Sequence, residues 1–487
     1  MLLALASSLT PYADFALDML KWLYVVSIVA SIIVIIGENR NPVKSLAWVT
    51  VLILLPVLGL VLYIFFGRSI KGLRLISRKS RKKLAAATLS ARPSLNIDRL
   101  PLSDESKQKV RLVNHLTGAQ YFTGNDIQIF TRGIDKFDAL KRDLEAATDH
   151  IHLQYYIYEN DHIGREIRDI LIRKAKQGVK VRIMYDHVGS FTIDAAFFKR
   201  MRREGVEAHP FLQLTIPKLA NRLNWRNHRK VVVIDGRIGY IGGMNIADRY
   251  VTGDKGKPAW RDTHLRITGP AVVALQYSFA VDWNYMSRTL LAETIPTVGE
   301  PDVTATEGVQ IVPSGPTDQW SNISMVFIKA ITLAKHTVFI QTPYFLPSDA
   351  LLKALQSAAL AGVDVRLMIP RNPDSRLLKL ASGSYIKECL LSGIKVYFYE
   401  PTMLHSKLVL IDDEFVTTGS TNFDFRSFEH NFECNALIYS REFNRRMRAI
   451  FAEDQRQCTR IIFSHWRRRP IITKAFESLA RLLSPIL

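Results

Sequence analysis

The chain has 487 residues, 48% hydrophobic and 10% aromatic, and its 65 lysines and arginines against 45 acidic residues give a formal charge of +20. This length predicts two or more domains, and the composition excludes a largely disordered chain. The basic excess favours an anionic partner, either nucleic acid or a membrane surface, and charge alone does not separate the two. The three cysteines, Cys389, Cys434 and Cys458, include no CxxC pair. This argues against a disulfide framework and fits a reducing cytoplasmic setting.

Two apolar stretches open the chain, at about 20–37 and at 45–67. Each is long enough to cross a bilayer as a helix, so residues 1–67 are predicted to form a membrane anchor with two transmembrane helices. A signal-peptide core is the alternative for the first stretch, but no small-residue cleavage site follows it. Pro56 lies inside the second stretch, where membrane helices tolerate proline.

A basic juxtamembrane linker is predicted over residues 68–115. Eight basic residues and no acidic residue lie between Arg68 and Lys83, whereas the loop between the apolar stretches offers only Arg40 and Lys44 against Glu38. The positive-inside rule then predicts a multi-pass plasma-membrane protein whose downstream part faces the cytoplasm. The basic run can also bind anionic headgroups, and a solvated linker is its alternative interpretation.

An internal repeat organises the rest of the chain. Residues 150–186 show the order strand, helix, strand, and residues 336–370 repeat it, with Gln154 matched by Gln341 and Gly178 by Gly362. We therefore predict an α/β fold of two duplicated lobes, 116–300 and 301–487, each a mixed β-sheet flanked by helices, related by a pseudo-twofold axis. Residues 293–306 are predicted to link them.

One motif occurs once in each lobe. Residues 228–245 read "HRKVVVIDGRIGYIGGMN" and residues 405–422 read "HSKLVLIDDEFVTTGSTN". Histidine, lysine, aspartate, glycine and asparagine recur at the same relative positions, 177 residues apart: His228, Lys230, Asp235, Gly242 and Asn245 answer His405, Lys407, Asp412, Gly419 and Asn422. A lone HxK is common by chance on a surface, but two copies matched at five positions favour a shared chemical role.

Strand parity separates the polar residues of the motif. In a strand, His228 and Lys230 share one face, while Asp235 falls on the other face and precedes Gly236, a turn signal. The same parity holds for His405 and Lys407 against Asp412. The histidine and lysine are thus predicted to be the chemical pair, and the aspartate to support the turn.

Two such lobes can supply a nucleophile and an acid together. A neutral imidazole can attack phosphorus to form a phosphohistidine, while a protonated imidazole donates to the leaving alkoxide. Two lysines can then stabilise the phosphoryl oxygens, and Asn245 and Asn422 are predicted to bind the same phosphate. The sequence contains no HExxH-type spacing, and we predict no metal or other cofactor.

The two HxKxxxxD segments, each followed by GxxN, resemble the signature of the phospholipase D superfamily. With segments such as "QTPYFLP" and "HNFECN", nearly the whole chain resembles the bacterial cardiolipin synthases of that superfamily. The resemblance implies transfer of a phosphatidyl group between two phosphatidylglycerol molecules, with release of glycerol. It further implies that His228 is the nucleophile and His405 the acid and base. The implied active positions are His228, Lys230, Asp235, His405, Lys407 and Asp412. Gly243 departs from the pattern, because many members have serine where the second half has Ser420.

Supporting residues follow each motif. Asp262 and Glu433 stand at similar places and could orient a catalytic imidazole, or form ordinary salt bridges. His264 is interpreted as structural rather than catalytic. The basic amphipathic tail, 465–487, fits either a helix lying on the bilayer or one packed on the second lobe.

Three other functions compete with a phosphatidyltransferase. A phospholipase would use water as acceptor at the same site. A nuclease would use the basic surface, but two predicted membrane helices argue against nucleic acid as the partner. A non-catalytic scaffold is disfavoured by two intact motifs. The sequence leaves the range of lipid substrates and the oligomeric state open.

Overall fold

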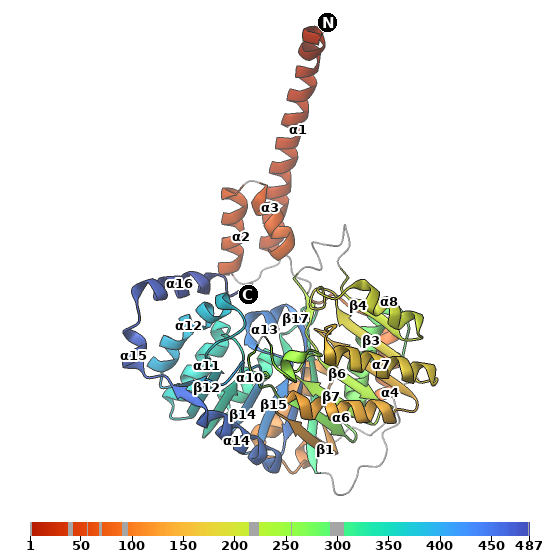
Figure 1. Cartoon of the computed structure of the whole chain (residues 1–487). Coiled ribbons are helices and arrows are strands. Elements are labelled where there is room, and N and C mark those ends of the chain that lie inside the picture. The colour runs from red at the N-terminus through yellow and green to blue at the C-terminus, as the bar shows by residue number, and fades with distance from the viewer. Residues whose placement is uncertain are drawn as a thin grey trace. The chain divides into compact units, whose positions relative to one another are not determined.

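The computed structural model describes residues 2–37, 42–55, 57–67, 71–89, 96–213, 224–254, 256–292, 306–485 and 487 (Figure 1). They divide into two compact units. The anchor unit comprises Met1–Ser69 with Leu214–Asn224, and the sheet unit comprises Ile70–Gln213 with Trp225–Leu487. The linker predicted at 293–306 lies almost wholly outside the described residues, so the lobe boundaries stay predictions.

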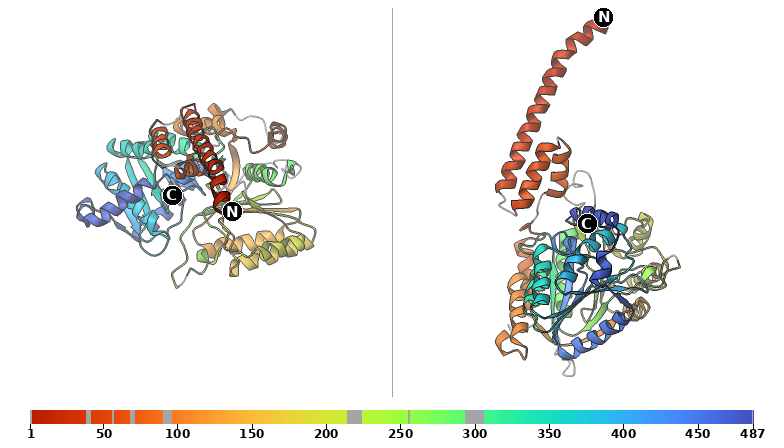
Figure 2. Two further views of the ribbon diagram at one scale, coloured as in Figure 1. Left: turned by 90° about the horizontal axis from the view of Figure 1, so that it is seen from above. Right: turned by 90° about the vertical axis from the view of Figure 1, so that its left-hand side faces the viewer.

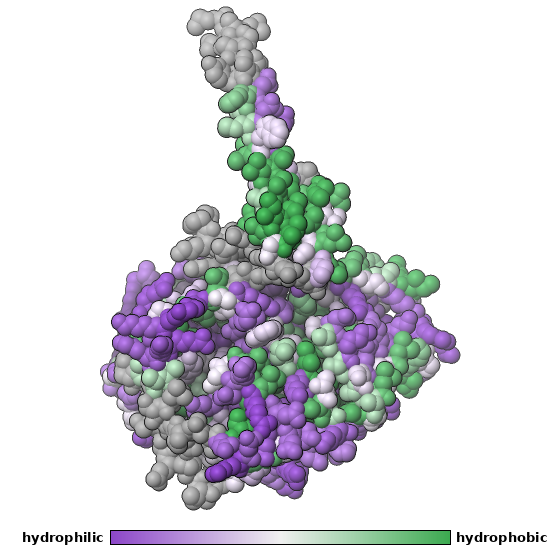
Figure 3. All heavy atoms as spheres, turned by 180° about the vertical axis from the view of Figure 1, so that it is seen from behind, coloured by the Kyte–Doolittle hydropathy of each residue, from purple (hydrophilic) through white to green (hydrophobic). Residues whose placement is uncertain are grey.

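Among the described residues, one helix is long and apolar enough to cross a membrane, and it belongs to the anchor unit. Within α1 (Leu2–Gly37), the segment Asp14–Gly37 meets both conditions, and it includes the first predicted span. The apolar side chains of this part of the chain form a largely green surface in Figure 3. The second predicted span is instead divided into α2 (Pro42–Leu54), α3 (Leu58–Leu62) and the π-helical turn η1 (Tyr63–Gly67).

The second apolar stretch folds back on itself, so the prediction of one continuous helix over 45–67 is wrong. Val57 has a φ of 61°, which ends a right-handed helix. The rings of Trp48 and Tyr63 lie 5.5 Å apart, whereas fifteen residues of continuous helix would separate them by about 22 Å. At about 20 Å, the thirteen-residue α2 is also shorter than a hydrocarbon core. Pro56 lies outside the described residues.

The sheet unit is built on one mixed sheet of sixteen described strands, with a separate two-stranded pair, β11 and β16. The strands of the first half are β1 (Phe122–Phe130), β2 (His150–Tyr155), β3 (Lys180–Asp186), β4 (Glu207–Phe211), β5 (Arg226–Asn227), β6 (Val231–Ile234), β7 (Ile238–Gly242) and β8 (His264–Thr268). Those of the second half are β9 (Glu307–Ser314), β10 (Thr337–Gln341), β11 (Phe345–Leu346), β12 (Asp364–Pro370), β13 (Lys395–Tyr399), β14 (Leu408–Ile411), β15 (Phe415–Gly419), β16 (Phe423–Asp424), β17 (Asn431–Tyr439) and β18 (Cys458–Arg460).

The strand order confirms the predicted duplication. Outward from the centre, the first half runs β1-β8-β7-β6-β2-β3-β4 and the second runs β9-β17-β15-β14-β10-β12-β13. Matching pairs have the same direction: β2 and β3 are parallel, as are β10 and β12, while β6 and β14 join antiparallel to β2 and β10. The halves meet where β1 pairs antiparallel with β9. The two lobes therefore share one continuous sheet.

Helices cover both faces of the sheet (Figures 1 and 2). Alternate residues of β6 point to opposite faces: Val231 and Val233 pack in the core that includes α9, whereas Val232 and Ile234 pack in the core that includes α6 and α7. The helical segments are α4 (Arg78–Leu89), η2 (Ile97–Arg99), α5 (Asp104–Thr117), α6 (Gly133–Ala146), α7 (His162–Lys176), α8 (Ala195–Arg203), η3 (Asp248–Tyr250), α9 (Val272–Ser287), α10 (Asn322–Thr332), α11 (Asp349–Leu360), α12 (Arg376–Leu391), α13 (Phe425–Glu429), α14 (Arg441–Arg456), α15 (Phe463–Arg467) and α16 (Ile471–Leu482).

The carboxyl-terminal tail combines features of both predicted alternatives. Helix α16 packs on α12, with Glu477 and Ala480 buried and Arg469 Nη2 donating to Glu477 Oε2 at 2.9 Å. Its other face is apolar and exposed, formed by Ile471, Ile472, Phe476, Leu479 and Leu482. The helix is thus held to the rest of the sheet unit by the face that carries Glu477 and Ala480.

Candidate active site

The two repeated histidines lie in segments that pair with the opposite half of the sheet. β5 runs parallel to β17, and the His228 backbone N–H donates to the Phe432 carbonyl at 2.9 Å. In the matching place, the His405 backbone N–H donates to the Arg261 carbonyl at 2.7 Å. The backbone of each histidine is therefore bonded to the opposite half, one residue before Glu433 for His228 and one residue before Asp262 for His405.

Each imidazole contacts a carboxylate from the opposite half. His228 Nδ1 lies 3.0 Å from Glu433 Oε1, and His405 Nδ1 lies 2.6 Å from Asp262 Oδ2. Both carboxylates are fully buried, and the histidines are only 8% and 6% exposed. A carboxylate that accepts the Nδ1 proton fixes the tautomer and leaves Nε2 for a reacting group. The structure thus joins the four residues crosswise, which the sequence did not predict.

The paired lysines lie beside their histidines, as strand parity predicted. Lys230 Nζ donates to the His228 carbonyl at 2.7 Å, and Lys407 Nζ donates to the His405 carbonyl. Lys407 Nζ also lies 2.8 Å from His405 Nδ1. One ring nitrogen cannot both donate to Asp262 and accept from Lys407, so we assign its proton to the shorter contact with Asp262.

Burial dominates the protonation of this group. It lowers the pKa of His228 to about 4, against the attraction of Glu433, and holds the pKa of His405 well below its ordinary value. It also lowers the pKa of Lys407 to about 8 and that of Lys230 well below its ordinary value. A phosphodiester anion placed between these groups would favour their charged forms, because an opposite charge raises the pKa of a base.

The two carboxylates differ in strength. Burial opposes ionisation of Glu433, but the His228 imidazole and then Lys230 outweigh it, so the pKa of Glu433 lies below its ordinary value. Burial raises the pKa of Asp262 to about 6 despite the charge of Lys407. The two halves of the site are therefore chemically unequal, although their geometry is matched.

The aspartates of the motif do not touch the imidazoles. Asp235 and Asp412 have φ values of 51° and 47°, at turns that follow β6 and β14. Asp235 Oδ1 and Oδ2 accept backbone N–H bonds from residues 148, 149 and 150 at 2.8–2.9 Å, and Asp412 does the same for residues 335, 336 and 337. The family signature implied that both aspartates belong to the active site. Their contacts with backbone N–H groups support a structural role instead. Each aspartate stabilises the start of the neighbouring strand, β2 or β10. Strand parity directs its side chain away from the histidine and lysine of the same motif.

Replacing Asp235 by alanine is expected to lower the free energy of unfolding by about 2–4 kcal/mol, because three N–H groups lose their acceptor and alanine tolerates this φ poorly. Partial burial opposes ionisation of Asp235, but the N–H groups of Thr148, Asp149 and His150 hold its pKa below the ordinary value. Its stabilisation is thus complete above the ordinary carboxylate pKa and is lost as the pH falls through the lower, folded-state value.

Urea unfolding of the solubilised chain at neutral and at acidic pH measures this effect. The exposed Asp126→Ala serves as the control, with an expected change within about 0.5 kcal/mol. Equal losses in the two variants, or a loss in Asp235→Ala that does not shrink at acidic pH, would contradict the capping role.

The two asparagines already have partners. Asn245 Nδ2 donates to the Tyr250 hydroxyl at 3.0 Å, and this hydroxyl lies 3.3 Å from His405 Nδ1. Asn422 Nδ2 donates to Asp424 Oδ2 at 2.9 Å, while Asn422 Oδ1 has no hydrogen-bond partner in the described part of the chain. In this structure Asn245 reaches the site through Tyr250, and direct phosphate binding by either amide stays a prediction.

Aromatic side chains that sequence reasoning missed surround the imidazoles. The Tyr156 ring lies 4.9 Å from that of His228, and the Trp260 ring lies 5.4 Å from that of His405. A lone aromatic residue carries no sequence signal of such a role, so only the fold reveals it. His264 is fully buried, burial holds its pKa well below the ordinary value, and neither ring nitrogen has a hydrogen-bond partner among the described residues, so its structural role stays a prediction.

Comparison with known proteins identifies the family. A family model described as cardiolipin synthase, PLD-like domain, matches residues 140–256 and 327–455, and the phospholipase D-nuclease N-terminal model matches residues 25–68. The major cardiolipin synthase ClsA of Bacillus subtilis is 39% identical over 479 residues, covering 96% of this chain and 99% of the relative. This chain belongs to the cardiolipin synthase family of the phospholipase D superfamily. The cardiolipin synthase of Listeria monocytogenes (strain EGD-e) is 37% identical over 485 residues, covering 97% of this chain and 100% of the relative.

A solved structure supports the fold. The phosphatidylserine synthase of Haemophilus influenzae superposes with a TM-score of 0.59 at 14% identity, covering 77% of this chain and 99% of that chain. At this identity the likeness concerns the fold alone. The sequence relatives, which span nearly the whole chain, establish the family of phosphatidyltransferases.

The departure from the family pattern at Gly243 has a structural reason. Ser420 Oγ donates to Glu433 Oε2 at 2.5 Å. At the matching place a Cβ on Gly243 would lie 2.2 Å from Asp262 Oδ1, so no serine fits there. Asp262 instead accepts the Thr263 backbone N–H at 2.6 Å. In this chain, Glu433 has a hydroxyl donor, whereas Asp262 occupies the space that the matching hydroxyl would need.

Proposed function

We propose that the chain transfers a phosphatidyl group from one phosphatidylglycerol to another, giving cardiolipin and glycerol through a phosphohistidine. The observation that carries this proposal is the crosswise arrangement, in which two buried imidazoles each contact a carboxylate of the other half. His228 uses only Nδ1 in its contact with Glu433, which leaves Nε2 for the phosphate, whereas His405 Nε2 also lies 3.1 Å from Lys407 Nζ, a cation that a bound phosphodiester would attract. A nucleophile and a proton donor can thus act on the same phosphodiester.

In the first step His228 Nε2 attacks phosphorus, and the bond from phosphorus to the oxygen of the headgroup glycerol breaks. His405 Nε2–H donates its proton to the departing alkoxide. In the second step the glycerol hydroxyl of another phosphatidylglycerol gives its proton to His405 Nε2 and attacks phosphorus, and the bond to His228 breaks. The Glu433 carboxylate stabilises the positive charge that develops on His228, and the choice of His228 as nucleophile follows the family resemblance.

The lysines stabilise the charge of the transition state. Lys230 and Lys407 are both buried next to the imidazoles, where a cation acts in a medium of low dielectric constant. Their pKa values are lowered by burial in the absence of an anion. Binding of the phosphodiester anion would raise the pKa values of both lysines and of His405. The substrate would thus favour the protonated His405 that acts as the acid.

Incubation of the purified chain with phosphatidylglycerol tests the function. Cardiolipin and glycerol are expected in equal amounts. Phosphatidic acid as the main product would show that water is the acceptor and would contradict the transferase. Turnover of DNA without turnover of lipid would favour a nuclease.

We further propose that α1 crosses the plasma membrane once and that α2 and α3 form a hairpin that enters and leaves the bilayer on the side of Gly37. The Val57 backbone N–H, at the tip of this hairpin, donates to the Tyr24 hydroxyl at 3.3 Å, midway along the predicted span. The basic residues that follow α1, Arg40 and Lys44 included, then belong to one side with residues 71–83, and only Lys21 belongs to the amino-terminal end of the span. The positive-inside rule makes that side cytoplasmic, and the catalytic lobes with it.

The amino terminus and residue 41 distinguish one span with a hairpin from two full spans, because the two topologies place each of them on opposite sides of the membrane. With one span and a hairpin, an amino-terminal tag is outside the cell and Asn41→Cys is inside. Two spans reverse both locations. Labelling intact cells with a membrane-impermeant maleimide, in a Cys458→Ser background because Cys389 and Cys434 are buried, decides between them. Labelling of Asn41→Cys before lysis would contradict the hairpin.

A further inference from the structure

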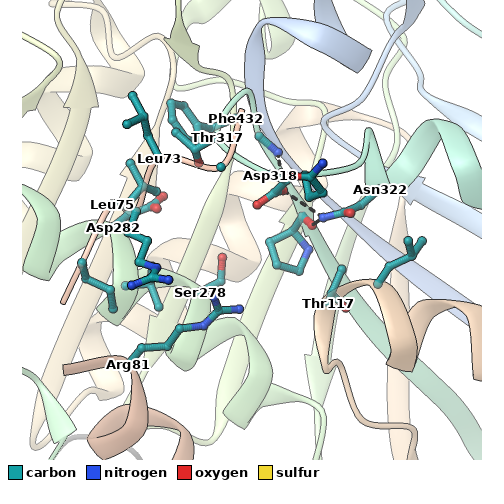
Figure 4. Close-up of a pocket in the computed structure, with 18 of the residues that line it drawn as sticks. Leu73, Leu75, Arg81, Thr117, Ser278, Asp282, Thr317, Asp318, Asn322 and Phe432 are labelled. Atoms are coloured by element: carbon teal, nitrogen blue, oxygen red, sulfur yellow. Dashed lines mark hydrogen bonds between the residues drawn. The ribbon is translucent and has the colours of Figure 1, made fainter. Parts of the chain in front are cut away.

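A pocket of about 480 Å³ lies on the face of the sheet opposite the two catalytic side chains of the first motif. Arg229, between His228 and Lys230, points to this face and lines the pocket. The other walls come from residues 72–81, from α9, from residues 313–322, and from Leu116, Thr117 and Phe432 (Figure 4). Its volume falls within the range of small-molecule sites.

Three arginines at this pocket are free to bind an anion. Arg74, Arg78 and Arg81 line it and are exposed. None of their side chains makes a hydrogen bond or ion pair with the residues that the structure describes, although the charge of Arg81 reaches Asp318, a carboxyl group that also lines the pocket. Figure 4 shows Arg81 extending from α4 into the pocket. A guanidinium group can bind two phosphate oxygens at once, so a cluster of three arginines without side-chain partners favours an oxyanion such as phosphate over a neutral ligand.

The wall of the pocket also offers a hydrogen-bond acceptor. Asp282 Oδ2 accepts bonds from Gln154 and Arg229 at 2.6 Å each and from Asn227 at 3.2 Å. Asp282 Oδ1 is buried and has no hydrogen-bond partner among the described residues. A buried carboxylate oxygen without a donor is destabilising, and a ligand hydroxyl would supply the donor.

We propose that this pocket binds the glycerophosphate headgroup of an anionic phospholipid, as a second lipid site apart from the catalytic centre. Phosphate at the arginines and a hydroxyl at Asp282 match the two polar ends of such a headgroup. Leu73 and Trp320, both exposed at the pocket, offer apolar surface to the start of the acyl chains. Residues 72–81 follow the membrane anchor directly in the chain, which favours a lipid over a soluble phosphate.

The site is connected to catalysis through Asp282. This carboxylate holds Asn227 and Arg229, the residues on either side of His228. A ligand hydroxyl that donates to Asp282 Oδ1 would bond to the same carboxylate from the pocket, on the face of the sheet opposite His228 and Lys230. A bound headgroup therefore stabilises the segment that carries the nucleophile without reaching the phosphorus under attack.

Equilibrium binding of radiolabelled dihexanoyl phosphatidylglycerol tests the proposal, with the full chain in detergent and a His228→Ala background that prevents turnover. Two molecules should bind each chain, one at the catalytic centre and one at the pocket. The double variant R78Q/R81Q should weaken the second site by at least about tenfold, since each charge-assisted bond to phosphate is strong. The double variant K82Q/K83Q removes the same charge from the same helix, but neither lysine lines the pocket, and it should bind two molecules.

The results of the binding experiment test the pocket and not the proposed transferase reaction. A single bound molecule, or equal weakening in both double variants, would overturn the proposal, the latter because it indicates general attraction to the basic helix. Competition by sn-glycerol 1-phosphate or inorganic phosphate at the concentration of the lipid would assign the site to a soluble anion and overturn the lipid source. Failure to make cardiolipin in the product assay would leave the binding result unaffected, so the two proposals fail separately.

Discussion

His228→Ala is expected to lower the rate of cardiolipin synthesis by at least about a thousandfold, because the imidazole that bonds to phosphorus is removed. The variant should also form no phosphohistidine. The chain labelled with phosphatidylglycerol carrying ³²P should retain acid-labile, base-stable label only when His228 is present. His115→Ala, at an exposed histidine far from either motif in the sequence, is the control and should retain full activity.

A substrate with a good leaving group separates the roles of the two histidines. Phosphatidyl-p-nitrophenol needs no acid to expel its leaving group, so His405→Ala should release a single burst of nitrophenol and accumulate phosphohistidine. The second step then stalls because no base accepts the proton of the incoming hydroxyl. His228→Ala should show no burst. A burst in His228→Ala with label on His405 would reverse the assignment.

The local part of the site was predictable because it depends on short periodicities. Strand parity placed His228 and Lys230 together and turned Asp235 away, and the backbone bonds to Asp235 agree with that. The repeat predicted two matched halves because strand order is encoded segment by segment. These features follow from residues within about twenty positions of one another in the chain.

The crosswise partners were not predictable in the same way. His228 and Glu433 are 205 residues apart, and only the parallel pairing of β5 with β17 brings them together. The sequence suggested that Asp262 and Glu433 orient imidazoles but not which one serves which. The break in the second apolar stretch was missed for a related reason: length and hydropathy do not register that Tyr63 returns to pack on Trp48.

Glu433→Gln is expected to lower the turnover of phosphatidylglycerol by about 10²–10⁴-fold, as the loss of a carboxylate behind a catalytic imidazole does elsewhere. The glutamine side chain has nearly the same shape but cannot balance the positive charge that His228 acquires when it attacks. Its amide can also donate to Nδ1, which selects the wrong tautomer. Asp262→Asn should have a loss of similar size, because His405 then loses its support.

The nitrophenyl substrate distinguishes the two carboxylates, and this distinction tests the crosswise pairing itself. Glu433→Gln should slow the burst, because Glu433 supports the nucleophile, whereas Asp262→Asn should leave the burst intact and slow only the steps after it. Ser420→Ala removes a single bond to Glu433 and should slow the burst by about tenfold. A burst that is slowed by Asp262→Asn and spared by Glu433→Gln would mean that His405 is the nucleophile.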